Sequence, residues 1–464
     1  MNKKLISLAV AAALVAPAAA MAEATLYGKL NVALDYVQVD NVILPTYNVT
    51  NLPEVWGFVR NPVNDTLVLT RNPGRGAVGT FIVPPGGQIT QGTDYDGWGM
   101  SAGGGNNYIP VNAPTTGAGG GQSSRLGVKG SEDLGGGLKA VYQIEFGINL
   151  DTNNNVASNS DTISMRNTFV GLAGGWGTFL MGRHDTPLKI STAKLDLFAD
   201  TLADYNTTIG FNDIRADAAV AYISPSFAGF TFAGALVPTG GSNALGSLNT
   251  ESNNISEGWS LAGIYSNGPF YASVAYESLG YNLFNSNSNN TECGLAATNC
   301  TNSTHDWNKW RVGLGLLDWN GFSLTAIYEN EDGIAGSDPF RQGTVLVGGA
   351  IPVNWVLPGN PNKADLWQLQ AAYAFGNNTI KAMYGQVGFN SDSYAPNPTS
   401  NATVLRQLDD FYNGNRSAWA VGYDYNFSKR TKVYALYTAV SDDRKETVAG
   451  SQWDGFSLGM SHSF

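Results

Sequence analysis

Apolar and polar side chains alternate with a period of two along most of this chain. In residues 419–427 every second side chain is Trp, Val, Tyr or Phe, and the side chains between them are Ala, Gly, Asp and Asn. The same alternation recurs in residues 309–316, 322–329 and 367–375. Alternation over about ten residues is typical of β-strands that have one apolar and one polar face. The pattern therefore predicts an all-β protein.

Sixteen segments carry this pattern, and the predicted strands are 25–36, 122–130, 137–148, 163–173, 176–183, 215–224, 229–238, 257–267, 269–279, 306–317, 321–330, 364–376, 378–388, 416–426, 430–440 and 453–464. The links between them alternate between short and long. Short links such as Gly174-Gly175 and Asn267-Gly268 contain the residues that hairpin turns require. The long links are rich in Gly, Asn, Asp and Thr. This arrangement predicts antiparallel pairing of consecutive strands.

Two architectures give every strand one apolar and one polar face. In a soluble sandwich the apolar faces point inward, whereas in a membrane barrel they point outward to lipid and the polar faces line a wet lumen. Only 14% of the residues are charged, against about a quarter in a typical soluble domain. Aromatic residues recur near predicted strand ends, as interfacial girdles require: Trp307, Trp310, Trp319, Tyr328, Trp367 and Tyr373. These features favour a transmembrane antiparallel β-barrel of 16 strands, with short periplasmic turns and long extracellular loops.

The link between the first two predicted strands is unusually long and covers residues 37–121. It is rich in Gly, Pro and Asn, and it has apolar patches at 66–70 and 77–83. Links of this length are normally functional or disordered. We interpret it as a long first extracellular loop inserted into the barrel domain. If two of its apolar patches are membrane strands instead, the strand count becomes 18.

The first 22 residues have the features of a secretory signal peptide. Two lysines precede an apolar stretch from Leu5 to Ala19, and Ala20-Met21-Ala22 has the small residues of a cleavage site. The apolar stretch is short for the ~20 residues that a membrane-spanning helix needs. We therefore expect residues 1–22 to be removed and residues 23–464 to form a single barrel domain. The formal net charge of −11 argues against a nucleic-acid partner.

Several segments resemble the Gram-negative general porin family. Residues 26–29, Leu-Tyr-Gly-Lys, are similar to the opening strand of the family. Residues 124–140 are similar to its second and third strands, and residues 166–183 to its fourth and fifth strands. The terminal strand, which ends at Phe464, adds a weaker match. The resemblance implies a homotrimer of 16-stranded barrels in the bacterial outer membrane, in contact with the lipid bilayer and lipopolysaccharide.

The resemblance also implies that the third loop, expected at residues 184–214, folds into the lumen as a constriction. Asp196, Asp200 and Asp204 in this loop repeat the spacing of four that acidic residues have in enterobacterial general porins. We expect them to form the acidic side of the pore constriction. The alternative is that they belong to an exposed acidic loop or cap a short helix.

Basic residues of the wall are expected to face these acids. Lys29, Arg125 and Arg166 match basic wall positions of the family, and Lys129 shares the face of Arg125 by period. The alternative is that they are merely solvated lumen charges. The sixth strand departs from the family, because residues 218–224 contain no base. That departure puts in question how strong the positive charge of this row of wall bases is.

These residues predict an outer-membrane porin, which passes small hydrophilic solutes and ions by passive diffusion without catalysis or a cofactor. Selectivity follows the local charge of the narrow neck. The negative net charge and the loop aspartates suggest a weak preference for cations, which the wall bases oppose. Two other hypotheses stay open: a substrate-specific outer-membrane channel with a binding site in the lumen, and a barrel-anchored adhesive or structural protein that uses the long first loop.

The remaining candidate chemistry is limited. His184, His305 and His462 are far apart, and none belongs to a pair with metal-ligand spacing, so we expect no metal site. Cys293 and Cys300 lie in a predicted loop of an exported protein, where an oxidising compartment allows thiols to pair. We expect them to form a local disulfide.

Overall fold

We describe the fold from a computed structural model, and the residues that it describes are 23–43, 46–48, 54–60, 67–71, 77–83, 88–90, 93–101, 123–150, 163–211, 213–238, 255–280, 306–333, 342–347, 351–356, 362–391, 414–443 and 452–464. The predicted signal peptide lies outside these ranges, as do Cys293, Cys300 and His305. Within them, no helix is long and apolar enough to cross a membrane.

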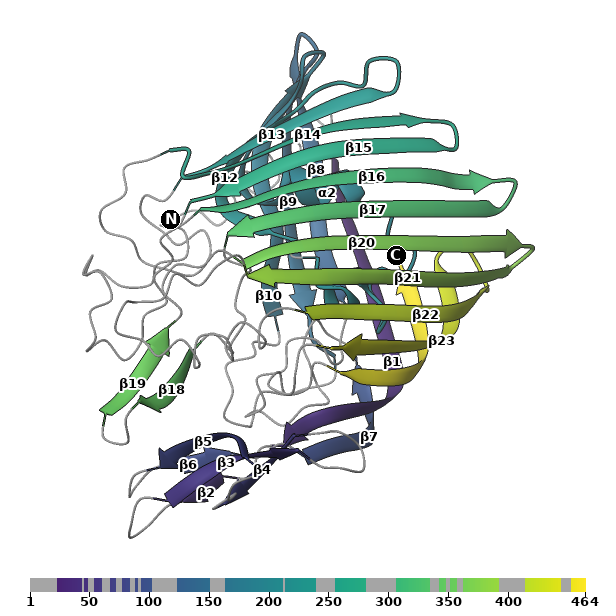
Figure 1. Cartoon of the computed structure of the whole chain (residues 1–464). Helices are drawn as coiled ribbons and strands as arrows, with labels where there is room; N and C mark the ends of the chain where they lie inside the picture. The colour runs from purple at the N-terminus through teal and green to yellow at the C-terminus, as the bar shows by residue number, and fades with distance from the viewer. Residues whose placement is uncertain are drawn as a thin grey trace, which may run out of the picture.

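Sixteen antiparallel strands form a closed ring (Figure 1). In order around the ring they are β1 (Glu23–Ile43), β8 (Ser124–Gly135), β9 (Leu138–Ile148), β10 (Ile163–Gly174), β11 (Gly177–Asp185), β12 (Arg215–Ile223), β13 (Phe230–Val237), β14 (Gly258–Asn267), β15 (Phe270–Leu279), β16 (Trp307–Trp319), β17 (Phe322–Gly333), β20 (Asn362–Phe375), β21 (Asn378–Ser391), β22 (Gly414–Asn426), β23 (Thr431–Asp442) and β24 (Trp453–Ser463). The ring closes because β1 pairs with β8 on one edge and with β24 on the other. The predicted 16-stranded antiparallel barrel is confirmed.

The first link departs from the predicted plain loop. Strand β1 continues to Ile43, and its second half pairs with β7 (Thr93–Ser101). Strand β7 follows β8 along the same edge of β1, toward the C-terminal end of β1. The apolar patches at 66–70 and 77–83 do not join the barrel. They coincide with β4 (Leu67–Arg71) and β5 (Ala77–Val83), which pair with β3 (Glu54–Arg60) in a separate sheet. The alternative count of 18 strands is therefore not realised.

Two short strand pairs complete the described strands outside the ring. β2 (Thr46–Asn48) pairs with β6 (Gln88–Thr90), and β18 (Gln342–Val347) pairs with β19 (Ile351–Val356). Both pairs lie beyond the ends of the barrel strands in Figure 1. Neither pair is part of the membrane wall.

Outward positions of the barrel carry the apolar set of each strand, as the alternation predicts. Leu314, Leu369 and Val274 are half or more exposed on this face, which is the pattern for a wall that contacts lipid. Near the long links, aromatic pairs on adjacent strands form a belt: Trp259–Tyr276, Trp310–Tyr328, Trp367–Tyr384, Trp419–Tyr437 and Tyr36–Trp98. Trp307 is not a girdle residue, because it faces inward and is 1% exposed.

The core of the molecule lies inside the barrel. The segment between β11 and β12, residues 186–214, is called the inward loop below. It contains α2 (Pro187–Thr192) and α3 (Tyr205–Thr208). Its apolar side chains form the main buried cluster together with inward side chains of β1, β17 and β20–β24. The loop therefore covers the inner face of the wall on that side. The inner face of β8–β12 is not covered by the described residues of the loop and lies across the lumen from it.

Candidate functional site

The inward loop begins with a capped helix. The Thr186 side chain accepts a hydrogen bond from the Lys189 N–H, and Pro187 occupies the first turn, where its missing N–H costs nothing. Leu188 is buried against Ala262 and Ala275 of the wall. Helix α2 contacts β13 to β16, so after β11 the chain passes β12 and runs along the inner face of the next part of the ring.

Glycines on the inner face of the wall make room for the loop. At five of them an added Cβ would lie within about 3 Å of an apolar loop side chain, and the pairs are Gly313–Leu195, Gly315–Leu195, Gly422–Phe198, Gly455–Leu202 and Gly385–Ile209. All four loop side chains are fully buried. Burying each one stabilises the packed loop by roughly 1.5–3 kcal/mol. The glycines of the polar faces thus allow close approach of a second layer.

Polar side chains of successive wall strands hold the main chain of the loop. They come from β15, β17, β20, β21 and β22, and the contacts are Tyr271 Oη to Ser191 O (2.8 Å), Thr325 Oγ1 to Leu195 O (2.8 Å), Leu197 N to Gln370 Oε1 (2.6 Å), Lys381 Nζ to Leu197 O (3.1 Å) and Arg416 Nη2 to Thr207 O (3.0 Å). Buried main-chain groups need such partners. The loop is therefore fixed to about half of the ring.

Asp200 lies opposite two predicted wall bases. Its Oδ2 is 2.7 Å from Lys29 Nζ and 3.5 Å from Arg125 Nη1. Lys29 and Arg125 are direct cross-strand neighbours on β1 and β8, and like charges in this position repel each other. Burial alone would raise the pKa of the Asp200 carboxyl, but the charges of Lys29 and Arg125 outweigh it and lower the pKa. Asp200 is therefore ionised between the two bases.

The backbone at Asp200 directs this contact. Its φ is +60°, in the left-handed region that Asp tolerates better than most residues. The Asp200 carbonyl accepts a hydrogen bond from Asn31 Nδ2 (2.5 Å), and its N–H donates to Asp204 Oδ2 (3.0 Å). The turn is held from the wall and from within the loop.

Asp196 and Asp204 do not share the position of Asp200. Asp196 is 7% exposed, and its carboxylate accepts from the Phe198 N–H (3.0 Å) and from Gln370 Nε2 (3.0 Å) on the far side of the loop. Burial raises the pKa of Asp196 to about 6. Asp204 is the N-cap of α3 and accepts from the Asn206 N–H (2.9 Å). The helix-cap alternative thus describes Asp204, and a spacing of four does not bring the three carboxylates to one surface.

Arg166 is aimed into the lumen by a β-bulge. Met165 pairs with Phe146 and Thr168 with Ile144, so that Arg166 and Asn167 together oppose the single residue Glu145. Bulges re-aim side chains in this way. Arg166 Nε lies 2.6 Å from Glu145 Oε1.

Lys129 lies apart from this group. It is exposed, and its Nζ is 5.0 Å from the centre of the Tyr27 ring, a cation–π contact.

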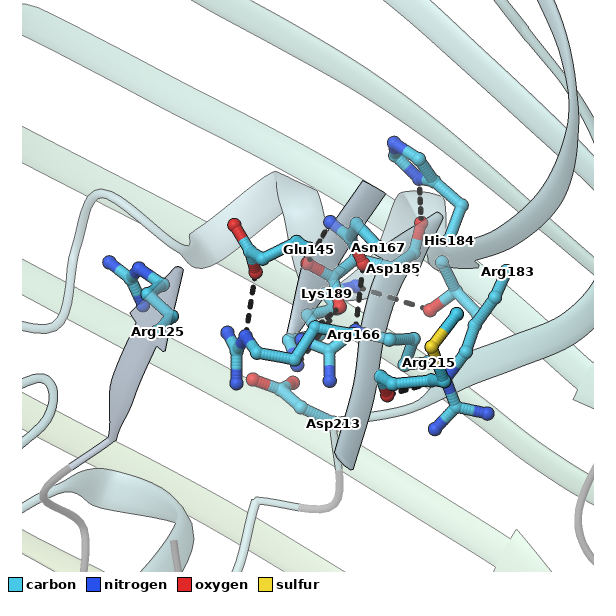
Figure 2. A network of polar contacts seen from close by, with 12 residues as sticks. Arg125, Glu145, Arg166, Asn167, Arg183, His184, Asp185, Lys189, Asp213 and Arg215 are labelled. Atoms are coloured by element: carbon cyan, nitrogen blue, oxygen red, sulfur yellow. Dashed lines mark hydrogen bonds and ion pairs between the residues drawn. The ribbon is translucent and has the colours of Figure 1, made fainter. Parts of the chain in front are cut away.

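A second charged group adjoins Arg166 and was not anticipated from the sequence (Figure 2). Asp185 Oδ1 is 3.0 Å from Arg215 Nη2 and 3.1 Å from Lys189 Nζ, and Asn167 bonds to both Asp185 and Arg215. Arg215 begins the sixth barrel strand. It supplies a base just before residues 218–224, which contain none. Because Arg215 is the first residue of the predicted strand 215–224, the sequence could have indicated this base.

Arg183 points the other way. It lies two residues after the outward, half-exposed Met181 on β11 and therefore shares that outward face, and it forms an ion pair with Asp217. In Figure 2 Arg183 extends away from Arg166 and Arg215. The Arg183–Asp217 pair therefore belongs to the outer surface of β11 and β12.

A closed barrel with an apolar exterior and a charged interior, narrowed by an inserted loop, defines a membrane channel. The model of the family described as Gram-negative porin matches residues 8–445, and the chain belongs to this family. An outer membrane porin protein of Bordetella pertussis is 25% identical over 366 residues, covering 74% of this chain and 82% of that protein. The major outer membrane protein P.IA of Neisseria meningitidis serogroup B is 26% identical over 363 residues, covering 74% and 81%.

Solved structures show the same fold. An anion-selective porin from Comamonas acidovorans aligns with a TM-score of 0.51 at 17% identity, covering 96% of this chain and all of that one. OmpT of Vibrio cholerae, in a trimer form, aligns with a TM-score of 0.51 at 12% identity, covering 96% and 99%. The protein is thus an outer-membrane porin, a water-filled channel for passive diffusion, and its relatives are channel proteins rather than enzymes.

Proposed function

We propose that Lys29, Arg125 and Arg166 on the wall, with Asp200 on the inward loop, form the selectivity constriction of this porin, and that it prefers anions. The observation that carries the proposal is that, of Asp196, Asp200 and Asp204, only Asp200 forms ion pairs with wall bases among the described residues. Diffusion of small hydrophilic solutes through this constriction needs no catalytic step.

The local charge supports an anion preference. The charged groups around the loop and the facing wall include five bases (Lys29, Arg125, Arg166, Lys189 and Arg215) and three carboxylates (Glu145, Asp185 and Asp200), a difference of +2. A low-dielectric wall focuses this local potential, which then outweighs the net charge of the whole chain. The weak cation preference suggested by the sequence counted Asp196, whose carboxylate is bound by Phe198 and Gln370, and Asp204, which caps α3. The Comamonas relative is described as anion-selective.

The test is the zero-current potential of the purified protein in planar bilayers under a KCl gradient. We expect the sign that corresponds to anion preference, and a smaller value at 1 M salt, where the Debye length is about 3 Å. Arg125→Gln should move the potential toward cations. A cation-selective wild-type channel would refute the assignment.

We also propose that three copies associate through the outer surface of β8–β12 and that lipopolysaccharide contacts the remaining wall. In the described part of β8–β12 there is no Trp–Tyr pair near the long links, whereas such pairs occur there on β14–β17 and β20–β23. Such girdles mark walls that meet lipid headgroups. The outward Arg183–Asp217 pair in the same sector would be costly against acyl chains. A protein neighbour would shield it.

A further inference from the structure

Arg311, on the inner face of β16, contacts both ends of the inward loop. Its side chain is fully buried, and its Nη1 lies 2.9 Å from Thr192 Oγ1 and 2.7 Å from Asp213 Oδ1. Thr192 ends α2 near the start of the loop, and Asp213 lies two residues before β12. We propose that Arg311 is a positioning residue of the pore, which fixes the loop between these two points and thereby sets the width of the lumen.

The wall fixes the guanidinium itself. Arg311 Nε donates to Glu329 Oε2 at 2.6 Å, and Glu329 is its direct cross-strand partner on β17. A planar guanidinium can bind several acceptors in fixed directions, which an ammonium cannot do. Arg311 therefore joins two positions of the loop to a rigid strand pair.

The end of the loop is packed around this contact. The Phe211 ring centre lies 5.2 Å from the Arg311 guanidinium, and the Tyr205 hydroxyl donates to Asp213. Both aromatic side chains are buried. Without Arg311, the Asp213 and Glu329 carboxylates would face each other in a buried site, where like charges repel strongly. The loop would then move away from the wall.

Loss of Arg311 affects the constriction because Asp200 lies in the chain between Thr192 and Asp213, the two positions that Arg311 holds. Its carboxylate meets Lys29 and Arg125 on the opposite side of the ring. Without Arg311 the loop keeps its wall contacts at Leu195, Leu197 and Thr207 but loses those at Thr192 and Asp213, so its distance from the facing wall is less closely fixed. The limiting width of the lumen then varies, and larger solutes pass more readily.

The experiment compares Arg311→Met and Asp213→Ala with Lys309→Met in reconstituted liposomes. Lys309 is the matched control, since it lies two residues away on the same face of β16, is equally buried, and pairs with Glu277 of the wall. The readout is the swelling rate with a neutral disaccharide relative to a pentose. Neutral sugars are chosen because the two test substitutions remove opposite charges, which would shift ion selectivity in opposite directions.

We expect both test variants to raise the relative disaccharide rate by about twofold or more, and Lys309→Met to leave it unchanged. The double variant should do no more than either single one, because all act through one contact. Heat-modifiable migration on gels confirms folding, and Asp213→Ala carries the test if Arg311→Met does not fold. Folded variants with wild-type swelling rates, or an equal change in Lys309→Met, would overturn the inference. The inference rests on the proposed constriction at Asp200, whose own failure would appear as a zero-current potential that Arg125→Gln leaves unchanged.

Discussion

Asp200 is the residue through which the loop meets the basic wall. Three carboxylates share a spacing of four in the sequence, but the left-handed backbone at Asp200 turns only this side chain toward Lys29 and Arg125. Asp196 is turned back toward Gln370. Asp200 and Asp196 therefore have different electrostatic roles although they belong to the same loop.

Asp200→Asn and Asp196→Asn should have different effects on ion selectivity. Removing the Asp200 charge raises the local difference from +2 to +3, so we expect the anion-to-cation permeability ratio to rise on the order of twofold. Asp196 lies behind the loop, and its substitution should leave the ratio unchanged. Zero-current potentials in a KCl gradient measure both. Equal shifts in the two variants would mean that Asp196 also faces the permeation path.

At the scale of the element, inward glycines link the strands to the loop. An added Cβ at Gly313 would lie 2.5 Å from Leu195 Cδ1, 2.7 Å from Ser273 Oγ and 3.0 Å from Thr192 Cγ2. Contacts this short cannot be kept. The glycine at 313 is thus required by the packed loop and also by Ser273 of the neighbouring strand.

Gly313→Val should therefore push α2 and Leu195 toward the open lumen. Overpacking of this kind costs about 1–3 kcal/mol, which a loop can relieve by moving while the strand stays paired. We expect a lower single-channel conductance and an unchanged denaturation temperature of the barrel. Gly263→Val is the control, because Gly263 lies on the outer face and its nearest neighbour would be 3.7 Å away. A normal conductance in Gly313→Val would show that the loop packing is more tolerant than proposed.

The sequence predicted the strands well, because the period of two is a property of each strand alone. All sixteen predicted ranges overlap a barrel strand. The sequence could not predict the bulge at Arg166 and Asn167, because the bulge depends on the register of β10 against β9. Nor could it show which side of the loop Asp196 faces, or that β7 extends the wall beside β1. These features depend on contacts between distant segments.

At the scale of the whole molecule, the barrel has two unlike sides. The inward loop packs on β14–β17 and β20–β24, where aromatic pairs mark the outer surface. The charged lumen wall of β8–β12 has no such pair near the long links in the described residues, and the Arg183–Asp217 ion pair lies on its outer surface. The side of the barrel with the charged lumen wall is therefore also the side without aromatic pairs near the long links. This arrangement is expected if β8–β12 face the centre of a trimer.

The interface can be tested by exchanging the charges of this pair. Arg183→Asp or Asp217→Arg alone leaves like charges in contact, and in a buried interface we expect a loss of about 3–5 kcal/mol per contact and a lower temperature of trimer dissociation on semi-native gels. The double exchange Arg183→Asp/Asp217→Arg restores opposite charges and should recover part of that temperature. Asp365→Arg is the control, since Asp365 is an exposed outward acid near Tyr328 in the aromatic belt. If Asp217→Arg and Asp365→Arg behave alike, the pair faces lipid or solvent, and the subunits associate through another part of the wall.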